Sequence, residues 1–271
     1  MRLTSIITLA AIPAAGSTHA CETPDTIVSD VYPTSTNLPE NLLRFYIYFS
    51  SPMGQDDILS SITLLDGDGA ELDGVFLSNR FNLWSPDRKR LTLLLDPGRV
   101  KTGLVANQAM GRALVAGQTY QLRIADTALD AKNCQLSASH FVSFETKVAD
   151  VSSPEPENWG LTIPQSGTRA PLTVTLDGAI DHLSLAYRLR ILKPDGTNVH
   201  GRIALDSFET VWRFTPREPW DQKIYQLSVD PLLEDLAGNR IDAVFDLDLG
   251  SSASSMTPST HRLVPFIPSP S

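Results

Sequence analysis

The sequence predicts an all-β protein built from two tandem antiparallel β-sandwiches. Apolar residues recur with a period of two rather than about 3.6, as in Phe45, Ile47 and Phe49, which alternate with Arg44, Tyr46 and Tyr48. Alternation over five or six residues is typical of a strand with one buried face. Asp-Gly pairs that suit tight turns lie between such segments, and no long amphipathic helical stripe interrupts them. Short strands joined by such turns indicate sandwiches.

Composition agrees with a folded protein and limits its partners. The 271 residues contain 22 Lys and Arg against 31 Asp and Glu, a net charge of −9, and 42% are hydrophobic. That apolar share supports a packed core, and the length suits one or two domains of roughly 100–200 residues. The acidic balance argues against a nucleic-acid partner. No segment after the N-terminus reaches the roughly 18 apolar residues of a transmembrane helix.

Residues 1–20 have the three parts of a secretory signal peptide. Arg2 gives a positive start, Leu3 to Ala15 is an apolar run without charge, and small residues at Thr18 and Ala20 precede a cut before residue 21. We therefore expect an exported protein in the periplasm, at the cell surface or outside the cell.

The mature chain contains two cysteines, Cys21 and Cys134. An even count in an oxidising compartment favours a disulfide between the mature N-terminus and a distant loop. Two alternatives stay open. Cys21 directly after the cut has the position of the lipidated cysteine of a bacterial lipoprotein, although Thr18 stands where such signals normally carry Leu. The two residues could also be free, inert thiols.

A polar segment with two prolines, residues 151–158, divides the mature chain. Proline cannot continue a sheet ladder, so this segment reads as a stiff linker between a first domain at 21–150 and a second at 159–250. Residues 251–271 form a Ser/Pro-rich tail. Its apolar end, Leu263 to Ile267, suits an added edge strand, for which the second domain is the favoured acceptor.

The two domains repeat one another weakly. Tyr120–Ile124 matches Tyr225–Val229, and each is followed by two Asp residues at similar spacing. Ile62–Leu65 leads to an Asp-Gly turn, as Leu189–Leu192 does in the second domain. Two copies of one sandwich are the simplest explanation of this pattern.

Several segments carry a family resemblance. In the first copy they are Phe49–Met53, Val115–Tyr120 and Phe144–Thr146, and in the second Phe214–Pro216, Tyr225 and Glu234–Asn239. Together they resemble bacterial Ig-like domains of the S-layer-protein (SbsA-like) type, whose most distinctive motif is the Asp-Leu-Ala-Gly-Asn of the last segment. The resemblance covers about residues 25–250 and implies two Ig-like sandwiches.

Each copy departs from the family pattern at one place. The first has Asp130–Cys134, without Gly, where the second has the distinctive motif, and the second has Leu176–Ile180 where the first has Phe-Ser-Ser-Pro-Met. Modules of this family serve as spacers, adhesive units and enzyme appendages. The resemblance therefore implies a fold and no particular activity.

The first copy carries about 22 extra residues around Asn82 to Ala113, where basic residues gather. Seven Lys and Arg lie between Arg80 and Arg112, against two Asp. A basic island on an acidic protein suits an anionic glycan or an acidic face of an envelope protein. Its predicted binding residues are Asp96, Arg99 and Lys101. The alternative is a solvated face whose Arg residues pair with the protein's own acids.

The tryptophans support a second candidate function. An exposed Trp84 or Trp212 would stack on sugar rings, as in a carbohydrate-binding or enzyme-accessory module. The alternative is that the Trp residues fill the sandwich cores or the joint between the domains.

The sequence predicts no enzyme, metal site or cofactor. Its four mature histidines lack zinc-ligand spacing, and it has no Gly-x-Ser-x-Gly elbow or phosphate-binding glycine loop. The acidic run Asp66–Glu71 lacks the spacing of a calcium loop. A hydrolase would need a polar pocket that these residues do not reveal. The leading hypothesis is a non-enzymatic exported module with a structural or interaction role.

Overall fold

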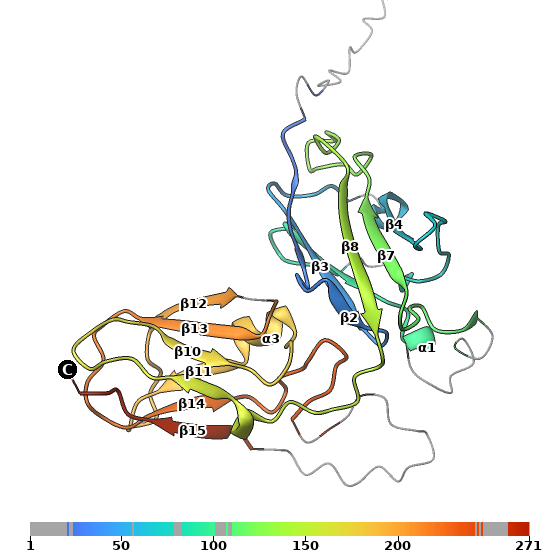
Figure 1. The fold of residues 1–271 in the computed structure, drawn as a ribbon. Helices are drawn as coiled ribbons and strands as arrows, with labels where there is room; N and C mark the ends of the chain where they lie inside the picture. Colours follow the sequence, from blue (N-terminus) through green and yellow to red (C-terminus); the bar gives the residue numbers. More distant parts are fainter. Residues whose placement is uncertain are drawn as a thin grey trace, which may run out of the picture.

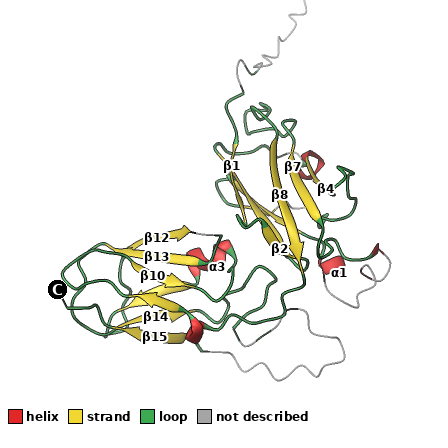
Figure 2. Cartoon of the chain, viewed as in Figure 1, coloured by secondary structure: helices red, strands yellow, loops and turns green. Residues whose placement is uncertain are grey.

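The structure, a computed structural model, describes residues 21, 24–55, 57–78, 83–100, 107, 110–206, 208–241, 243, 245 and 260–270. The predicted signal peptide and Lys101 lie outside the described residues. Strands make up most of the regular structure, and the helices are short (Figure 2). The strands form four sheets around two hydrophobic cores, so the predicted all-β tandem of sandwiches is confirmed.

The first domain consists of two four-stranded sheets. One has the order β1 (Val28–Tyr32), β3 (Arg44–Phe49), β6 (Arg90–Leu94) and β5 (Leu83–Trp84). The other has the order β2 (Asn37–Pro39), β8 (His140–Lys147), β7 (Thr119–Ile124) and β4 (Ile62–Leu65). All pairs are antiparallel except β2 with β8. The short helices are η1 (Ile58–Ser61) and α1 (Pro97–Val100).

The second domain has a four-stranded and a three-stranded sheet. The first has the order β12 (Gly201–Asp206), β13 (Val211–Pro216), β10 (Leu172–Thr175) and β9 (Gly160–Thr162). The second has the order β11 (Leu189–Leu192), β14 (Tyr225–Val229) and β15 (Arg262–Phe266). The turn η2 (Pro156–Asn158) precedes β9, and α3 (His182–Tyr187) connects β10 to β11.

Both domains follow the path of an Ig-like sandwich. If the strands of each domain are lettered A to G along the chain, with β2 as an extra A′, strands A, B, E and D form one sheet and C, F and G the other. A tyrosine lies within the first two residues of the F strand of each domain and fixes the preceding corner. The Tyr120 hydroxyl accepts the Val115 N–H at 3.0 Å, and the Tyr225 hydroxyl accepts the Asp221 N–H at 3.2 Å. The repeated Tyr-Gln-Leu segments are therefore equivalent strands with the same hydrogen bond.

The C-terminal segment supplies the last strand of the second domain. β15 pairs along its whole length with β14, in the place that β8 takes beside β7 in the first domain. Phe266 is buried and packs against Trp220 and Tyr225, with ring centroids 5.7 Å away in both pairs. Pro265 is accommodated because β15 is the edge of its sheet.

The two domains differ most between their E and F strands. The connection from β6 to β7 runs from 95 to 118, whereas that from β13 to β14 runs from 217 to 224. Residues 101–106 of the longer connection lie outside the described residues. Figure 1 shows the second domain lying across one end of the first, so that the chain has an L shape. The surface where the two meet is therefore the natural place to look for a composite site.

Substituting Phe266 tests whether the C-terminal strand is integral to the second domain. We expect Phe266→Ala to lower the free energy of unfolding by about 3–5 kcal/mol, the range for an aromatic side chain removed from a core. The matched control is Leu263→Ala on the same strand, because Leu263 is 48% exposed and should cost no more than about 0.5 kcal/mol. Urea denaturation measures both. Equal, small losses would show that β15 is dispensable.

Candidate functional site

The outer face of β3 is covered by the second domain. The sequence alone indicates a strand with an inner face of Phe45, Ile47 and Phe49, and the structure places these residues in the core. On the opposite face, however, Tyr46 is only 2% exposed. In the sequence, this contact is indicated only by the large side chains of Arg44, Tyr46 and Tyr48, which alternate along the face expected to be solvent-exposed. The interface that they form with the second domain is the candidate site.

A network of charged and phenolic groups lies at the centre of this interface. The Tyr46 hydroxyl donates to Asp181 Oδ2 at 2.8 Å, and Arg44 Nε lies 3.7 Å from the same oxygen. Arg44 Nη2 also donates to Glu234, whose other carboxylate oxygen accepts two bonds from Arg240 at 2.9 and 2.7 Å. Two residues on the same face of β3 thus hold two separate segments of the second domain.

Asp181 connects this network to the local structure of the second domain. It is the N-cap of α3, because its Oδ1 accepts the Ser184 N–H at 3.0 Å. Burial raises the pKa of its carboxyl group, and the charge of Arg44 and the bond from Tyr46 partly offset this effect. Burial likewise raises the pKa of the Tyr46 phenol, so the phenol is a proton donor at neutral pH. Each partner therefore depends on the others for its hydrogen bonds.

A second buried carboxylate holds the chain just after β1. Glu209 is only 3% exposed and accepts the Thr34 N–H at 3.0 Å and the Thr34 hydroxyl at 2.8 Å. The backbone of Glu209 has a φ of +60°, a value that residues other than glycine rarely adopt. Burial raises the pKa of Glu209, opposed by the bonds from Thr34. The turn between β12 and β13 is thereby fixed to the first domain.

His182 contributes an aromatic contact rather than a charge. Its ring stacks on Tyr32 with centroids 3.6 Å apart and planes at 22°, and Tyr48 meets it edge-on at 5.8 Å. Burial and the nearby Arg90 lower the pKa of His182 to about 4. The imidazole is therefore neutral at pH 7 and packs as an apolar ring between the domains.

The Asp-Leu-Ala-Gly-Asn motif forms a turn that docks on the first domain. Asp235 Oδ1 accepts the N–H groups of Ala237 at 2.8 Å and Asn239 at 2.9 Å. The Leu43 N–H donates to the Leu236 carbonyl at 3.1 Å, and the Leu236 side chain joins the core of the first domain. The glycine and the asparagine at the end of this motif also have structural roles.

Glycine is favoured at 238 for two reasons. Its φ is +83°, and a Cβ atom there would lie 2.3 Å from Leu43 Cδ1. Asn239, the next residue, fixes the start of the linker. The Asp150 carbonyl accepts hydrogen bonds from Asn239 Nδ2 at 3.1 Å and from Asn41 Nδ2 at 2.8 Å. The motif thus sets both the approach of the two domains and the course of the chain between them.

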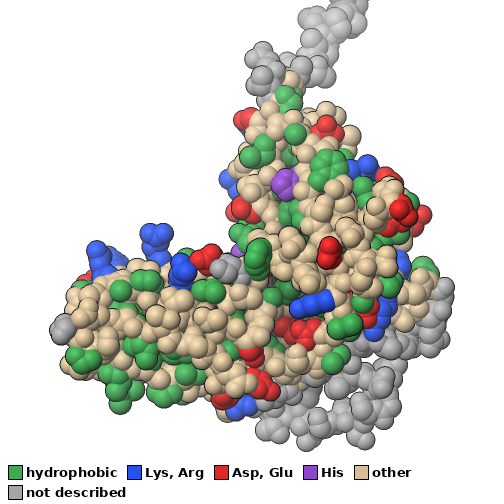
Figure 3. Space-filling model, viewed as in Figure 1, with side chains coloured by type: hydrophobic (Ala, Val, Ile, Leu, Met, Phe, Trp, Pro, Cys, Tyr) green, Lys and Arg blue, Asp and Glu red, His purple; other side chains and the backbone are tan. Residues whose placement is uncertain are grey.

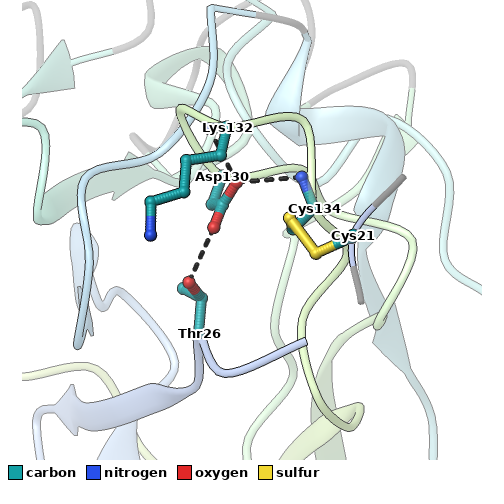
Figure 4. Close-up of a disulfide and its surroundings, with 5 residues drawn as sticks. All are labelled: Cys21, Thr26, Asp130, Lys132 and Cys134. Atoms are coloured by element: carbon teal, nitrogen blue, oxygen red, sulfur yellow. Dashed lines mark hydrogen bonds between the residues drawn. A yellow bond between two sulfur atoms is a disulfide. The ribbon is translucent and has the colours of Figure 1, made fainter. Parts of the chain in front are cut away.

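The first domain uses the same turn for a different contact. Asp130 Oδ1 accepts the N–H groups of Lys132 at 2.8 Å and Cys134 at 2.9 Å, and its Oδ2 accepts the Thr26 hydroxyl at 2.9 Å (Figure 4). Cys134 occupies the position that Asn239 has in the second domain. It forms a disulfide with Cys21, with Cα atoms 5.5 Å apart, as the sequence predicts. A sulfur atom in a disulfide cannot also be a free thiol or carry a thioether-linked lipid.

The structure gives the predicted binding residues of the basic loop a local role. Asp96 Oδ1 accepts the Gly98 N–H of its own loop at 2.8 Å. Arg99 is only 9% exposed. The Arg99 guanidinium donates to four carbonyl groups at 2.9–3.2 Å, those of Asp73, Gly74, Gly111 and Arg112. A guanidinium with its donors used in this way holds a loop together. Lys101 lies outside the described residues, and partner binding by this loop stays a prediction.

Other residues of the basic island also contact their own domain. Arg88 donates to the Met53 carbonyl at 2.8 Å and stands 5.2 Å from the centre of the Trp84 ring. Lys89 Nζ donates to the Ser50 carbonyl at 3.1 Å, and Arg112 lies 3.7 Å from Glu40. These contacts favour the alternative in which the island binds the protein's own polar groups.

The proposed sugar platform at Trp212 is wrong because this side chain is completely buried. Trp220 and Trp159 are 2% and 6% exposed and belong to the same core. Trp84 is partly exposed, packs against Phe49 at 5.7 Å and has Arg88 over its ring. Most of the tryptophans therefore fill the sandwiches.

A cleft of about 280 Å³ lies beside the linker, between the two domains. Asp177, which lines it, accepts the Trp159 indole N–H and the Glu155 N–H, both at 2.8 Å. Ser152 donates to Asp150 at 2.6 Å. These polar side chains hold the linker. Among the described residues, no group of three His, Cys, Asp or Glu side chains is placed to hold a metal ion, and no helix is long and apolar enough to cross a membrane.

Arg44→Ala tests the polar network. Removing the guanidinium leaves Asp181 and Glu234 beside an apolar gap, so we expect a loss of about 2–3 kcal/mol in the free energy of unfolding. We also expect urea unfolding to separate into two transitions as the domains lose their contact. The control is Lys223→Ala, which removes an exposed ion pair with Asp221 and should leave the curve unchanged. A single unshifted transition for Arg44→Ala would contradict this role.

Asp235 gives the stability a defined pH dependence. Burial raises its pKa from 3.8 to about 7, against the bonds from Asn239. The folded protein keeps this proton up to about pH 7, whereas the unfolded chain releases it near pH 4. The folded state therefore binds more protons in this window and loses stability as the pH rises through it.

We expect the free energy of unfolding of the natural protein, relative to Asp235→Asn, to fall by up to about 4 kcal/mol between pH 4 and pH 7. His182 acts in the opposite direction but is present in both proteins, so it cancels in the difference. In the control Asp195→Asn, the difference should stay flat in this window, since the Thr197 hydroxyl lowers the pKa of Asp195. A flat difference for Asp235→Asn would disprove the assignment.

Comparison with known proteins adds little beyond the fold. No protein-family model matches the chain, and no curated protein matches it. Among solved structures, the chain is similar to the MG0-NIE-MG1 domains of Escherichia coli alpha-2-macroglobulin, with 13% identity, 78% of this chain and 67% of that chain covered, and a TM-score of 0.29.

It is also similar to the N-terminal Ig1-2 module of the Drosophila receptor protein tyrosine phosphatase DLAR. Here the identity is 13%, the coverage 78% of this chain and 93% of that chain, and the TM-score 0.26. Similarity at this level carries no argument about activity or partner.

Proposed function

We propose that the chain is an exported, non-enzymatic protein whose two Ig-like domains act as one rigid structural or interaction module of the cell envelope or the extracellular space. The observation that carries this proposal is the joint between the domains. A carboxylate network, a stacked histidine and the docked Asp-Leu-Ala-Gly-Asn turn fix their relative orientation.

A fixed joint is useful to a protein that positions surfaces rather than one that opens and closes. Contacts from three segments of the second domain, near Asp181, Glu209 and Leu236, reach β1, β3 and the chain between them. Short sequence segments of both domains resemble the SbsA-like family, whose modules serve as spacers and adhesive units.

Export is supported by the sequence of residues 1–20 and by the disulfide at Cys21. Disulfides persist in oxidising compartments and are rare in the cytosol. We expect the full chain, expressed in a bacterial host, to be recovered outside the cytoplasm with residues 1–20 removed, and its mass to rise by about 2 Da on reduction of the disulfide. A chain that stays in the cytoplasm with both thiols reduced would refute export.

Gly238→Ala tests the need for a rigid joint. The added methyl group would lie 2.3 Å from Leu43 Cδ1, so the Leu43 side chain must move away from the docked turn. We expect the loosened contact to appear in small-angle scattering as a broader range of shapes. Gly196→Ala is the matched control. Its φ of +80° imposes similar backbone strain, but nothing lies within 4 Å of the added atom.

Binding of the purified protein to envelope fractions of the host should weaken for Gly238→Ala and not for Gly196→Ala. Equal binding by both variants would show that the fixed orientation is not needed for the interaction role.

A further inference from the structure

β12 is an open sheet edge that lacks the usual protection of such edges. It lies at the end of its sheet, with β13 on one side (Figure 1). It is six residues long, the longest strand at any sheet edge in the described part of the chain. The two five-residue edge strands are interrupted, β15 by Pro265 and β1 by a register shift between Val28 and Asp30. β12 has no proline, lysine or bulge, three of the features with which proteins block edge pairing, and its two charged residues, Arg202 and Asp206, have opposite signs.

The register with β13 shows which backbone groups of β12 face outward. The Arg217 N–H donates to the His200 carbonyl at 2.8 Å, so residue 200 and every second residue after it exchange hydrogen bonds with β13. The N–H and C=O groups of Gly201, Ile203 and Leu205 therefore point away from β13, toward the open edge. A second strand can bond to these groups without disturbing the sheet.

The side chains of β12 are complementary to a second copy of the same strand. If two copies pair antiparallel about Ala204, Ile203 of one copy lies opposite Leu205 of the other, and these two residues carry the outward-facing backbone groups. Arg202 of the first copy then lies opposite Asp206 of the second copy. By the two-fold symmetry, Asp206 of the first copy lies opposite Arg202 of the second. Opposite charges at such facing positions stabilise a pair of strands.

We propose that this chain forms a two-fold symmetric dimer through antiparallel pairing of β12 with β12 of a second copy. The pairing joins two four-stranded sheets into one continuous sheet. This proposal rests on the interaction role proposed above and assigns it one partner, a second copy of the chain. If no dimer forms, the proposals of export and of a rigid joint are unaffected.

The exposure and charge of the edge support a second copy as its occupant. Ile203 is 40% exposed, although it lies on the face of β12 that is continued by the buried Phe214 of β13. Pairing would cover it with Leu205 of the second copy. Lys and Arg side chains project from this side of the second domain (Figure 3). A partner strand that carried only basic residues would therefore be repelled, whereas a second copy of β12 also supplies an Asp.

Asp206 can serve both copies at once. Its Oδ2 accepts Arg213 Nη2 of its own chain at 3.1 Å, and both side chains of this pair are almost half exposed. A carboxylate has about four lone-pair sites, so Asp206 can accept a further bond from Arg202 of the second copy while it keeps the bonds of its own chain. The self-complementary order Arg-Ile-Ala-Leu-Asp is therefore compatible with the intramolecular ion pair.

The test is a charge exchange measured by sedimentation of the mature, oxidised chain over a wide concentration range. The natural protein should show a concentration-dependent dimer. Arg202→Asp places two Asp residues opposite each other, and Asp206→Arg places two Arg residues together. Each variant alone should therefore raise the dissociation constant by about tenfold or more. An equimolar mixture of the two restores both opposite-charge pairs and should recover the dimer.

A second pair of variants tests the backbone pairing. Ile203→Pro removes an N–H that faces the open edge and leaves the bonds to β13 intact, so it should prevent dimerisation. Ile203→Ala keeps the N–H and should retain a weaker dimer. A natural protein that stays monomeric up to near-millimolar concentration would overturn the proposal. So would a dimer that survives Ile203→Pro, or two charge variants that fail to associate when mixed.

Discussion

The structure depends on the burial of the outer face of one strand. β3 has a core on one side, as any sandwich strand has, but its other side carries the buried Tyr46 and the partly buried Arg44 into contact with the second domain. A charge removed from water must find an opposite charge and hydrogen bonds at the same place. Asp181 and Glu234 provide them, and both belong to segments that follow strands of the second domain. The orientation of the domains follows from satisfying these few polar groups.

The two copies use one turn in two ways. In both, an aspartate accepts the N–H groups two and four residues later. The same aspartate also forms an isolated β-bridge, Asp130 with Met53 and Asp235 with Ile180. In the first domain the turn ends in a cysteine that anchors the N-terminal segment. In the second it ends in Asn239, which holds the linker. One scaffold thus serves a covalent contact at one end of the molecule and a domain contact in its middle.

The distribution of charge has a structural explanation that residue counts do not provide. The basic residues near Arg99 mostly bind carbonyl groups or acids of their own domain, because an irregular connection has few backbone partners of its own. The edge at β12, by contrast, needs only one arginine and one aspartate four residues apart to be self-complementary. The arrangement of a few charges therefore says more about partners than the net charge does.

The sequence by itself determined the all-β class, the tandem of two sandwiches and several of their strands, and it favoured the cysteine pair over two alternatives. Period-two alternation, Asp-Gly turns and the repeated Tyr-Gln-Leu segments are local signals, and each strand needs only its own residues to show which face is apolar. Tertiary structure alone decided what covers the other face. The alternating pattern places Tyr46 on an outer face, and only the structure shows that Asp181, far along the chain, covers it. The sequence leaves open whether Trp212 is exposed or buried, and only the structure shows that it is buried. Such contacts depend on which distant segments meet, and an alternating pattern carries no information about its partner.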